Sequence, residues 1–138
     1  MELVWTVLLV LGAGGAAAPL QADPQGAVAV VYYWKAKGGR LEEYNRYIRE
    51  VAEPIDAEGQ RRGAFLSVTT FVSQRQDGPW THMRIFILKD RSQLEGLSAA
   101  LDAAGVRLEP DEKKRKARSE YAATLRDFAG QEILDILR

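Results

Sequence analysis

The stretch AVAVVYYWK, residues 27–35, decides the fold. Six of its nine residues are β-branched or aromatic, a composition typical of a strand. Both alternating faces of this strand are apolar, so we expect it to lie centrally in its sheet with other material covering each face. Lys37, Gly38 and Gly39 follow it and end it, because glycine interrupts regular strand structure.

A helix is expected next, over residues 40–62. Its apolar residues recur at steps of three or four, which places them on one face of a helix. They are Leu41, Tyr44, Ile48, Val51 and Ile55. Pro54 lies inside this pattern and removes a backbone donor, so it should kink the helix or split it in two. Gly63 is expected to end the helix.

Two further strands are expected over residues 65–72 and 81–88. Residues 76–79 (QDGP) between them have the composition of a turn, so the two strands should form an antiparallel hairpin. Strict alternation divides the second of them into two faces. Met83, Ile85 and Ile87 share one face, and His82, Arg84, Phe86 and Leu88 share the other.

The remaining chain indicates two helices and a last short element. Residues 92–95 (SQLE) form a capping box, which predicts a helix starting there and closing at Gly105. Pro110 should open another helix, whose apolar stripe continues to Phe128 before Gly130 interrupts it. Residues 131–137 fit either a helical turn or a strand, and a strand is favoured because the sheet needs a fourth one.

The order of elements predicts an α+β fold. Strand, helix, strand, strand, helix, helix, strand is the ferredoxin-like arrangement, a four-stranded antiparallel sheet with helices on one face. The helices cover only one face, whereas the strands are apolar on both. We therefore expect the uncovered face to pack against the same face of a second copy, in a homodimer that encloses side chains between two sheets.

The chain resembles the dimeric α/β-barrel superfamily. The resemblance rests on residues 30–35 (VVYYWK), 37–44 (KGGRLEEY) and 80–86 (WTHMRIF) followed by Asp90, and it covers most of the chain after residue 22. The superfamily includes cofactor-free monooxygenases, haem-degrading monooxygenases, stress-responsive proteins and many exported proteins of unknown role. The resemblance therefore implies a fold and a homodimer, but it selects no function.

The first 22 residues are interpreted as a secretory signal peptide. Residues 3–11 are almost wholly apolar, and a tract of glycine and alanine follows. The apolar run falls short of the roughly 20 residues that span a bilayer, so no stable membrane anchor is expected. Glu2 stands where a positive charge is usual, and the alternative is a buried N-terminal element. With Ala22 as its last residue, the signal leaves one domain, residues 23–138, exported to the periplasm or secreted.

Composition excludes several kinds of site. The chain has no cysteine and one histidine, so disulfides, thiolate metal sites and a cysteine nucleophile are excluded, and no metal site is expected. Its 19 basic and 19 acidic residues give no electrostatic argument for nucleic-acid binding. The basic run at residues 113–116, together with Arg118, is interpreted as a solvated helix face. The resemblance to haem-degrading members would require an asparagine, a tryptophan and a haem-ligating histidine in the family's places. Asn45 lies on the first helix and no histidine lies on the helix after the third strand, so the chain departs from those members and no cofactor is expected.

His82 and Arg84 are the candidate catalytic residues. They share a strand face two residues apart, so the histidine could exchange a proton beside a cation that orients an anionic or carbonyl group. The alternative is a strand-end histidine paired to solvent or backbone.

Five aromatic residues are the candidate ligand-binding residues: Tyr32, Trp34, Phe71, Trp80 and Phe86. They could line an apolar pocket for a flat molecule between the two sheets, or they could fill the dimer core. The pattern does not determine which face of the first strand, that of Tyr32 and Trp34 or that of Tyr33, points inward.

Three functions remain open. The first is a non-catalytic exported homodimer that binds a small apolar or aromatic molecule. The second is a cofactor-free monooxygenase or isomerase, with His82 as base and Arg84 stabilising an oxyanion. The third is a purely structural or interaction module.

Overall fold

The computed structural model describes residues 26–137, so the expected signal peptide lies outside the described residues. The elements follow in the order β1 (Val28–Ala36), α1 (Leu41–Tyr47), the π-helical turn η1 (Ile48–Ala52), α2 (Glu53–Arg61), β2 (Ser67–Val72), β3 (His82–Leu88), α3 (Arg91–Leu108), α4 (Glu112–Leu125) and β4 (Arg126–Asp135). None of the helices within residues 26–137 is long and apolar enough to cross a membrane.

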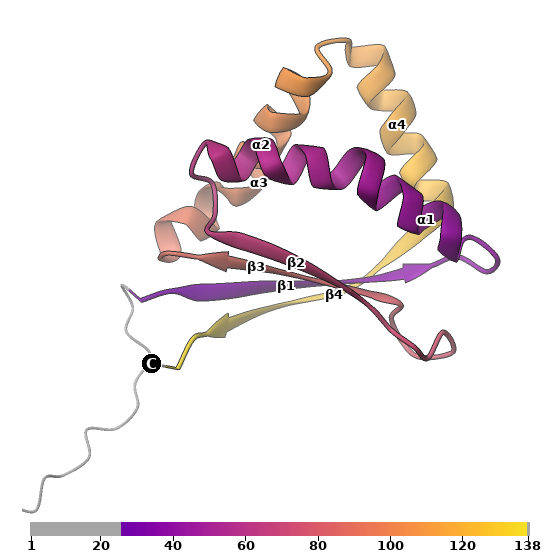
Figure 1. The fold of residues 1–138 in the computed structure, drawn as a ribbon, viewed down its shortest axis with the longest axis horizontal. Helices are drawn as coiled ribbons and strands as arrows, with labels where there is room; N and C mark the ends of the chain where they lie inside the picture. The colour runs from indigo at the N-terminus through magenta and orange to yellow at the C-terminus, as the bar shows by residue number, and fades with distance from the viewer. Residues whose placement is uncertain (1–25, 138) are drawn as a thin grey trace, which may run out of the picture.

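The four strands form one antiparallel sheet in the order β2-β3-β1-β4. β1 therefore lies inside the sheet, between β3 and β4, as its two apolar faces predict. Residues 131–134 pair with β1, so the favoured interpretation of the last segment as a strand is confirmed. The helices lie on one side of the sheet and leave its other side uncovered (Figure 1). This confirms the α+β, ferredoxin-like architecture expected from the order of elements.

Pro54 changes the first helix without breaking it. It lies in the first turn of α2, and the π-helical turn η1 immediately precedes it. A π-turn adds a residue to the helical ladder, which accommodates the backbone donor that proline lacks. The three segments run on as one rod across the sheet (Figure 1).

Four helix boundaries differ from the sequence-based expectation, one of them the start of α4, which begins at Glu112 behind the N-cap Asp111 and not at Pro110. α3 begins at Arg91, because the Asp90 carboxylate accepts hydrogen bonds from the backbone amides of Ser92 and Gln93 and is the real N-cap. The helix also continues through Gly105 to Leu108. α4 ends earlier than expected, at Leu125, so Phe128 belongs to β4, where its ring packs against Trp34.

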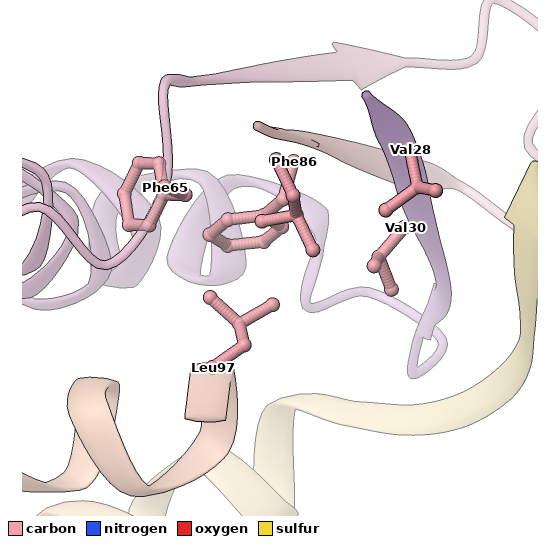
Figure 2. Packing of buried hydrophobic residues seen from close by; sticks show 6 residues of the cluster. Val28, Val30, Phe65, Phe86 and Leu97 are labelled. Carbon is pink, nitrogen blue, oxygen red and sulfur yellow. The ribbon is translucent and has the colours of Figure 1, made fainter. Parts of the chain in front are cut away.

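The hydrophobic core lies between the sheet and the helices. One cluster joins Phe65 and Leu97 to β1 and β3, with the Phe65 and Phe86 rings edge to face at 5.0 Å (Figure 2). The second cluster lies at the other end of β1, where Tyr44 and Leu125 pack against Ala36. Between these clusters the helices diverge, and this divergence creates the cavity described below.

The uncovered face of the sheet is largely apolar. The register places Ala29, Val31, Ile85 and Ile87 side by side on it, in the middle of the sheet. Phe71 and Leu134 flank them on the outer strands, and each is 46% exposed in the single chain. Ala29 and Val31 in the middle of this face are only 7% and 2% exposed in the single chain, but the helices lie on the other side of the sheet (Figure 1), so a second copy would cover mainly the exposed apolar residues of the outer strands.

Candidate functional site

The structure decides which face of β1 points towards the helices. Tyr32 pairs with Arg84 and Trp34 with His82, and all four lie on the helix side of the sheet. Tyr33 faces the uncovered side. His82 and Arg84 do share a face, but that face is inside the protomer and not in the space between two sheets.

His82 is fully buried and both of its ring nitrogens are engaged. The Thr81 hydroxyl lies 2.9 Å from Nδ1, and the Asn45 side-chain oxygen lies 2.8 Å from Nε2. Because Asn45 presents an oxygen to Nε2, that nitrogen carries the ring proton and Nδ1 accepts from the Thr81 hydroxyl, which also lies 3.3 Å from the backbone oxygen of Trp34 and accepts the backbone N–H of Ala36. Nε2–H then donates to Asn45, which defines a neutral imidazole. The His82 ring also packs edge to face on the Tyr44 ring, with the two ring centroids 4.4 Å apart.

The pKa of His82 follows from this environment. Burial, and then the positive charges of Arg126 and Arg84, lower it from 6.5 to about 4. The ring is therefore uncharged at neutral pH and is a weak base. The geometry is that of a buried histidine whose hydrogen bonds are satisfied by its own chain.

Asn45 is the partner that sequence reasoning assigned to no site. Asn45 belongs to α1, and its side-chain oxygen contacts His82. The Asn45 side-chain nitrogen lies 3.4 Å from a Glu42 carboxylate oxygen, and this contact supports the orientation of the amide. Asn45 also lines a surface hollow of about 330 Å³ between the first helix and β2. It stands between the histidine and solvent.

Arg84 is paired with a buried carboxylate. It forms an ion pair with Asp56 of α2, and its Nε donates to the Thr70 hydroxyl at 3.1 Å. Burial raises the pKa of Asp56, an effect that the positive charge of Arg84 opposes. The charge of Arg84 is therefore matched by its own chain, and the sequence could not reveal this because Asp56 lies 28 residues away.

The five candidate ligand-binding aromatics do not line one pocket. Tyr32 packs edge to face on Phe86 at 5.8 Å, and Phe86 is part of the core. Phe71 lies on the uncovered face, and Trp80 packs against Tyr33 at 5.6 Å. Trp34 is the one member of the set that lines the cavity below the helices. Their part in ligand binding stays a prediction.

A cavity of about 640 Å³ lies where the helices diverge above the sheet. All layers of the fold contribute to its wall. Trp34 and Arg126 come from the sheet, Tyr47, Val51 and Ile55 from the first helical rod, Leu101, Asp102, Gly105 and Val106 from α3, and Arg115, Arg118, Ser119, Ala122 and Ala123 from α4. The wall is therefore mainly apolar, with charged groups at a few positions.

Arg126 is the central charged residue of this cavity. Its guanidinium lies over the Trp34 ring, 3.7 Å from the ring centroid, and donates a hydrogen bond to the Tyr44 hydroxyl at 2.8 Å. Burial raises the pKa of Tyr44, which keeps this phenol protonated. Arg126 could not be predicted from the sequence pattern, because it falls inside the expected last helix. In the structure it is the first residue of β4, where the chain turns back under the helices.

Arg115 and Arg118 correct the interpretation of the basic run. They are partly buried in the cavity wall, whereas the neighbouring Lys113, Lys114 and Lys116 are exposed. The signal was present in their spacing, since positions 115, 118 and 122 fall on one face of a helix. Within residues 26–137, no group of histidine, aspartate and glutamate is arranged to hold a metal ion.

The fold can be compared with known proteins. No family model and no curated protein sequence matches the chain. Solved structures, in contrast, do match the fold of this chain. The fold is ferredoxin-like.

A NIPSNAP family protein of unknown function from Agrobacterium tumefaciens superimposes with a TM-score of 0.59 at 13% identity, over 85% of this chain and 94% of its own. HapK from Hahella chejuensis gives a TM-score of 0.56 at 6% identity, over 80% and 92%. SnoaB, a cofactor-independent oxygenase from Streptomyces nogalater, gives 0.50 at 12% identity, over 82% and 95%. At these identities the likeness establishes the ferredoxin-like fold alone.

Proposed function

We propose that this protein binds a small flat molecule in the cavity between its helices and its sheet. The observation that carries the proposal is the cavity itself, whose volume of about 640 Å³ falls within the usual range of ligand sites. Trp34 and Tyr47 supply aromatic surface, and a few polar groups converge on the same space. This places the ligand inside each protomer, whereas the sequence-based hypothesis put it between two sheets.

A homodimer is part of this proposal. The apolar uncovered face, with Phe71 and Leu134 each 46% exposed, is suited to a second copy of itself. Packing there would cover the face without obstructing the cavity, because the two lie on opposite sides of the sheet.

Ligand binding can be tested with a fluorescent probe and a cavity-filling variant. N-phenylnaphthylamine, a neutral aromatic dye, should bind saturably at one site per chain. Ser119→Trp places an indole in the cavity and should abolish this binding. Ser98→Trp, at an exposed position of α3, is the matched control and should leave binding intact. Equal binding by both variants would show that the dye lies elsewhere and would contradict the proposal.

The geometry does not favour the oxygenase or isomerase alternative. A base at position 82 must accept a proton, but the ring nitrogens of His82 are engaged by Thr81 and Asn45, and its pKa is about 4. Arg84 is likewise neutralised by Asp56. This alternative stays a prediction, and loss of dioxygen uptake with aromatic substrates on His82→Gln substitution would support it. The third alternative, a purely structural or interaction module with the space between two sheets packed solid, is not tested by a cavity on the helix side of the sheet and stays a prediction.

We also propose that the protein is exported. The proposal rests on the apolar run at residues 3–11 and the glycine and alanine tract behind it. Amino-terminal sequencing of the protein from cell fractions should find a chain that begins at Asp23 outside the cytoplasm. An intact amino terminus in the cytoplasmic fraction would contradict it.

A further inference from the structure

We propose that the ligand of the cavity is an organic anion, a flat apolar body that carries a carboxylate, sulfonate or phenolate. This inference rests on the proposed function and adds the chemical class of the ligand. It is carried by the charges of the cavity wall, where Arg115, Arg118 and Arg126 face a single acidic residue, Asp102. The wall therefore has an excess of two positive charges in a mainly apolar cavity that is open to solvent.

Two other arginines, the buried Arg84 and the more exposed Arg107, have buried carboxylate partners. Arg84 is paired with Asp56, and Arg107 with the buried Glu58. Arg126 is different, because within residues 26–137 it forms no ion pair and its one side-chain hydrogen bond goes to the neutral Tyr44 phenol. A partly buried cation without a counter-ion is costly, and an anionic ligand would remove that cost.

The placement of Arg126 suits recognition of an anion. Stacking over Trp34 and the hydrogen bond to Tyr44 hold the guanidinium plane in one orientation. The donors that Tyr44 does not use are then presented in a fixed fork, a geometry that matches two oxygens of one acidic group. Trp34 lines the same wall, so a ring attached to that acidic group can pack on aromatic surface.

Arg115 and Arg118 extend the positive field along α4. Arg115 is fixed by hydrogen bonds from one terminal nitrogen to the backbone oxygens of Glu109 and Pro110, at 2.8 and 2.7 Å. Arg118 forms no ion pair or side-chain hydrogen bond within the described part of the chain. These charges line the same cavity as Arg126 and would favour entry of an anion over a neutral molecule.

Two dyes with the same ring system test the inference. Anilinonaphthalene sulfonate carries a sulfonate, and N-phenylnaphthylamine does not. The sulfonate should bind the wild-type protein about ten-fold more tightly or better, because a charge-assisted hydrogen bond contributes that much. Ser119→Trp should abolish binding of both dyes, which shows that they occupy the cavity and not the uncovered face of the sheet.

Arginine variants identify the residue responsible. Arg126→Met keeps the apolar stem and should weaken sulfonate binding about ten-fold, while binding of the neutral dye changes by less than about two-fold. Arg118→Met, which removes no hydrogen bond or ion pair within residues 26–137, should weaken sulfonate binding less and serves if Arg126→Met does not fold. Arg46→Met, on the exposed side of α1, is the control and should change neither.

The outcomes separate the two proposals. If the neutral dye binds in the cavity but the sulfonate binds no more tightly, or if the arginine variants leave the preference unchanged, the inference of an anionic ligand is overturned and the binding function stands. If neither dye binds saturably, the binding function is overturned together with the inference.

Discussion

Acidification should destabilise this protein through a single side chain, His82. In the native state burial and two nearby arginines hold the pKa of this ring at about 4, whereas in the unfolded chain it returns to 6.5. Below pH 6.5 the unfolded state therefore binds a proton that the native state does not bind. The contribution of His82 to stability is complete above its unfolded pKa and is lost progressively as the pH falls towards its native pKa.

The magnitude follows from the difference between the two pKa values. Well inside the window each pH unit changes the free energy of unfolding by about 1.4 kcal/mol per proton, and the change is smaller near pH 6.5, where the unfolded ring is only half protonated, so the loss between pH 6.5 and pH 5 is about 1.6 kcal/mol. This is a large fraction of the roughly 5–15 kcal/mol that stabilises an ordinary domain. Most carboxylates titrate below this window, so the histidine should dominate it.

Urea unfolding followed by tryptophan fluorescence measures this loss, at one fixed protein concentration because the protein is proposed to dimerise. His82→Gln keeps an uncharged hydrogen-bonding group and should remove most of the pH dependence between pH 6.5 and pH 5. The chain has no other histidine, so its one imidazole signal in a proton NMR titration reports the native pKa directly. A native pKa near 6.5, or an equal slope in the variant, would refute the reasoning.

Three further predictions concern the packing. Arg84→Met should lower the free energy of unfolding in urea by about 3–5 kcal/mol, because it leaves Asp56 buried without its cation. Adding Asp56→Leu should restore most of that stability, and no recovery in the double variant would contradict this. Ile85→Asp, on the uncovered face, should give a folded monomer by sedimentation analysis, and an unchanged sedimentation coefficient would argue against a dimer through that face. Asp90→Ala should lower the free energy of unfolding by about 1 kcal/mol and Ser92→Ala by less, because Asp90 caps α3. A larger loss in Ser92→Ala than in Asp90→Ala would indicate that Ser92 is the cap.

The sheet and its topology could be predicted because short-range patterns determine them. β1 is recognisable from its β-branched and aromatic residues, and the hairpin of β2 and β3 from strict alternation on each side of a turn. Helix ends were less predictable, since competing local signals lie close together. At the start of α3, both Asp90 and Ser92 can cap a helix, and only the backbone geometry shows that Asp90 accepts the amide hydrogens.

The candidate site was only partly predictable. His82 and Arg84 were expected on one strand face, and the register confirms that they share it. Their partners, Asn45 and Asp56, come from a helix that is distant in sequence, and no local pattern connects them to β3. Arg126 was missed because its role depends on the point at which α4 ends, and a boundary of this kind is poorly determined by sequence.

The sequence by itself determined a four-stranded sheet that is apolar on both faces, because side-chain alternation within one strand is a local property. Only the tertiary structure decided which face the helices cover, what neutralises Arg84, and that a cavity lined by Trp34 and Arg126 remains between the helices and the sheet. These features depend on how separate elements pack against one another, and the distances between residues far apart in the chain are set by that packing and not by their local sequence.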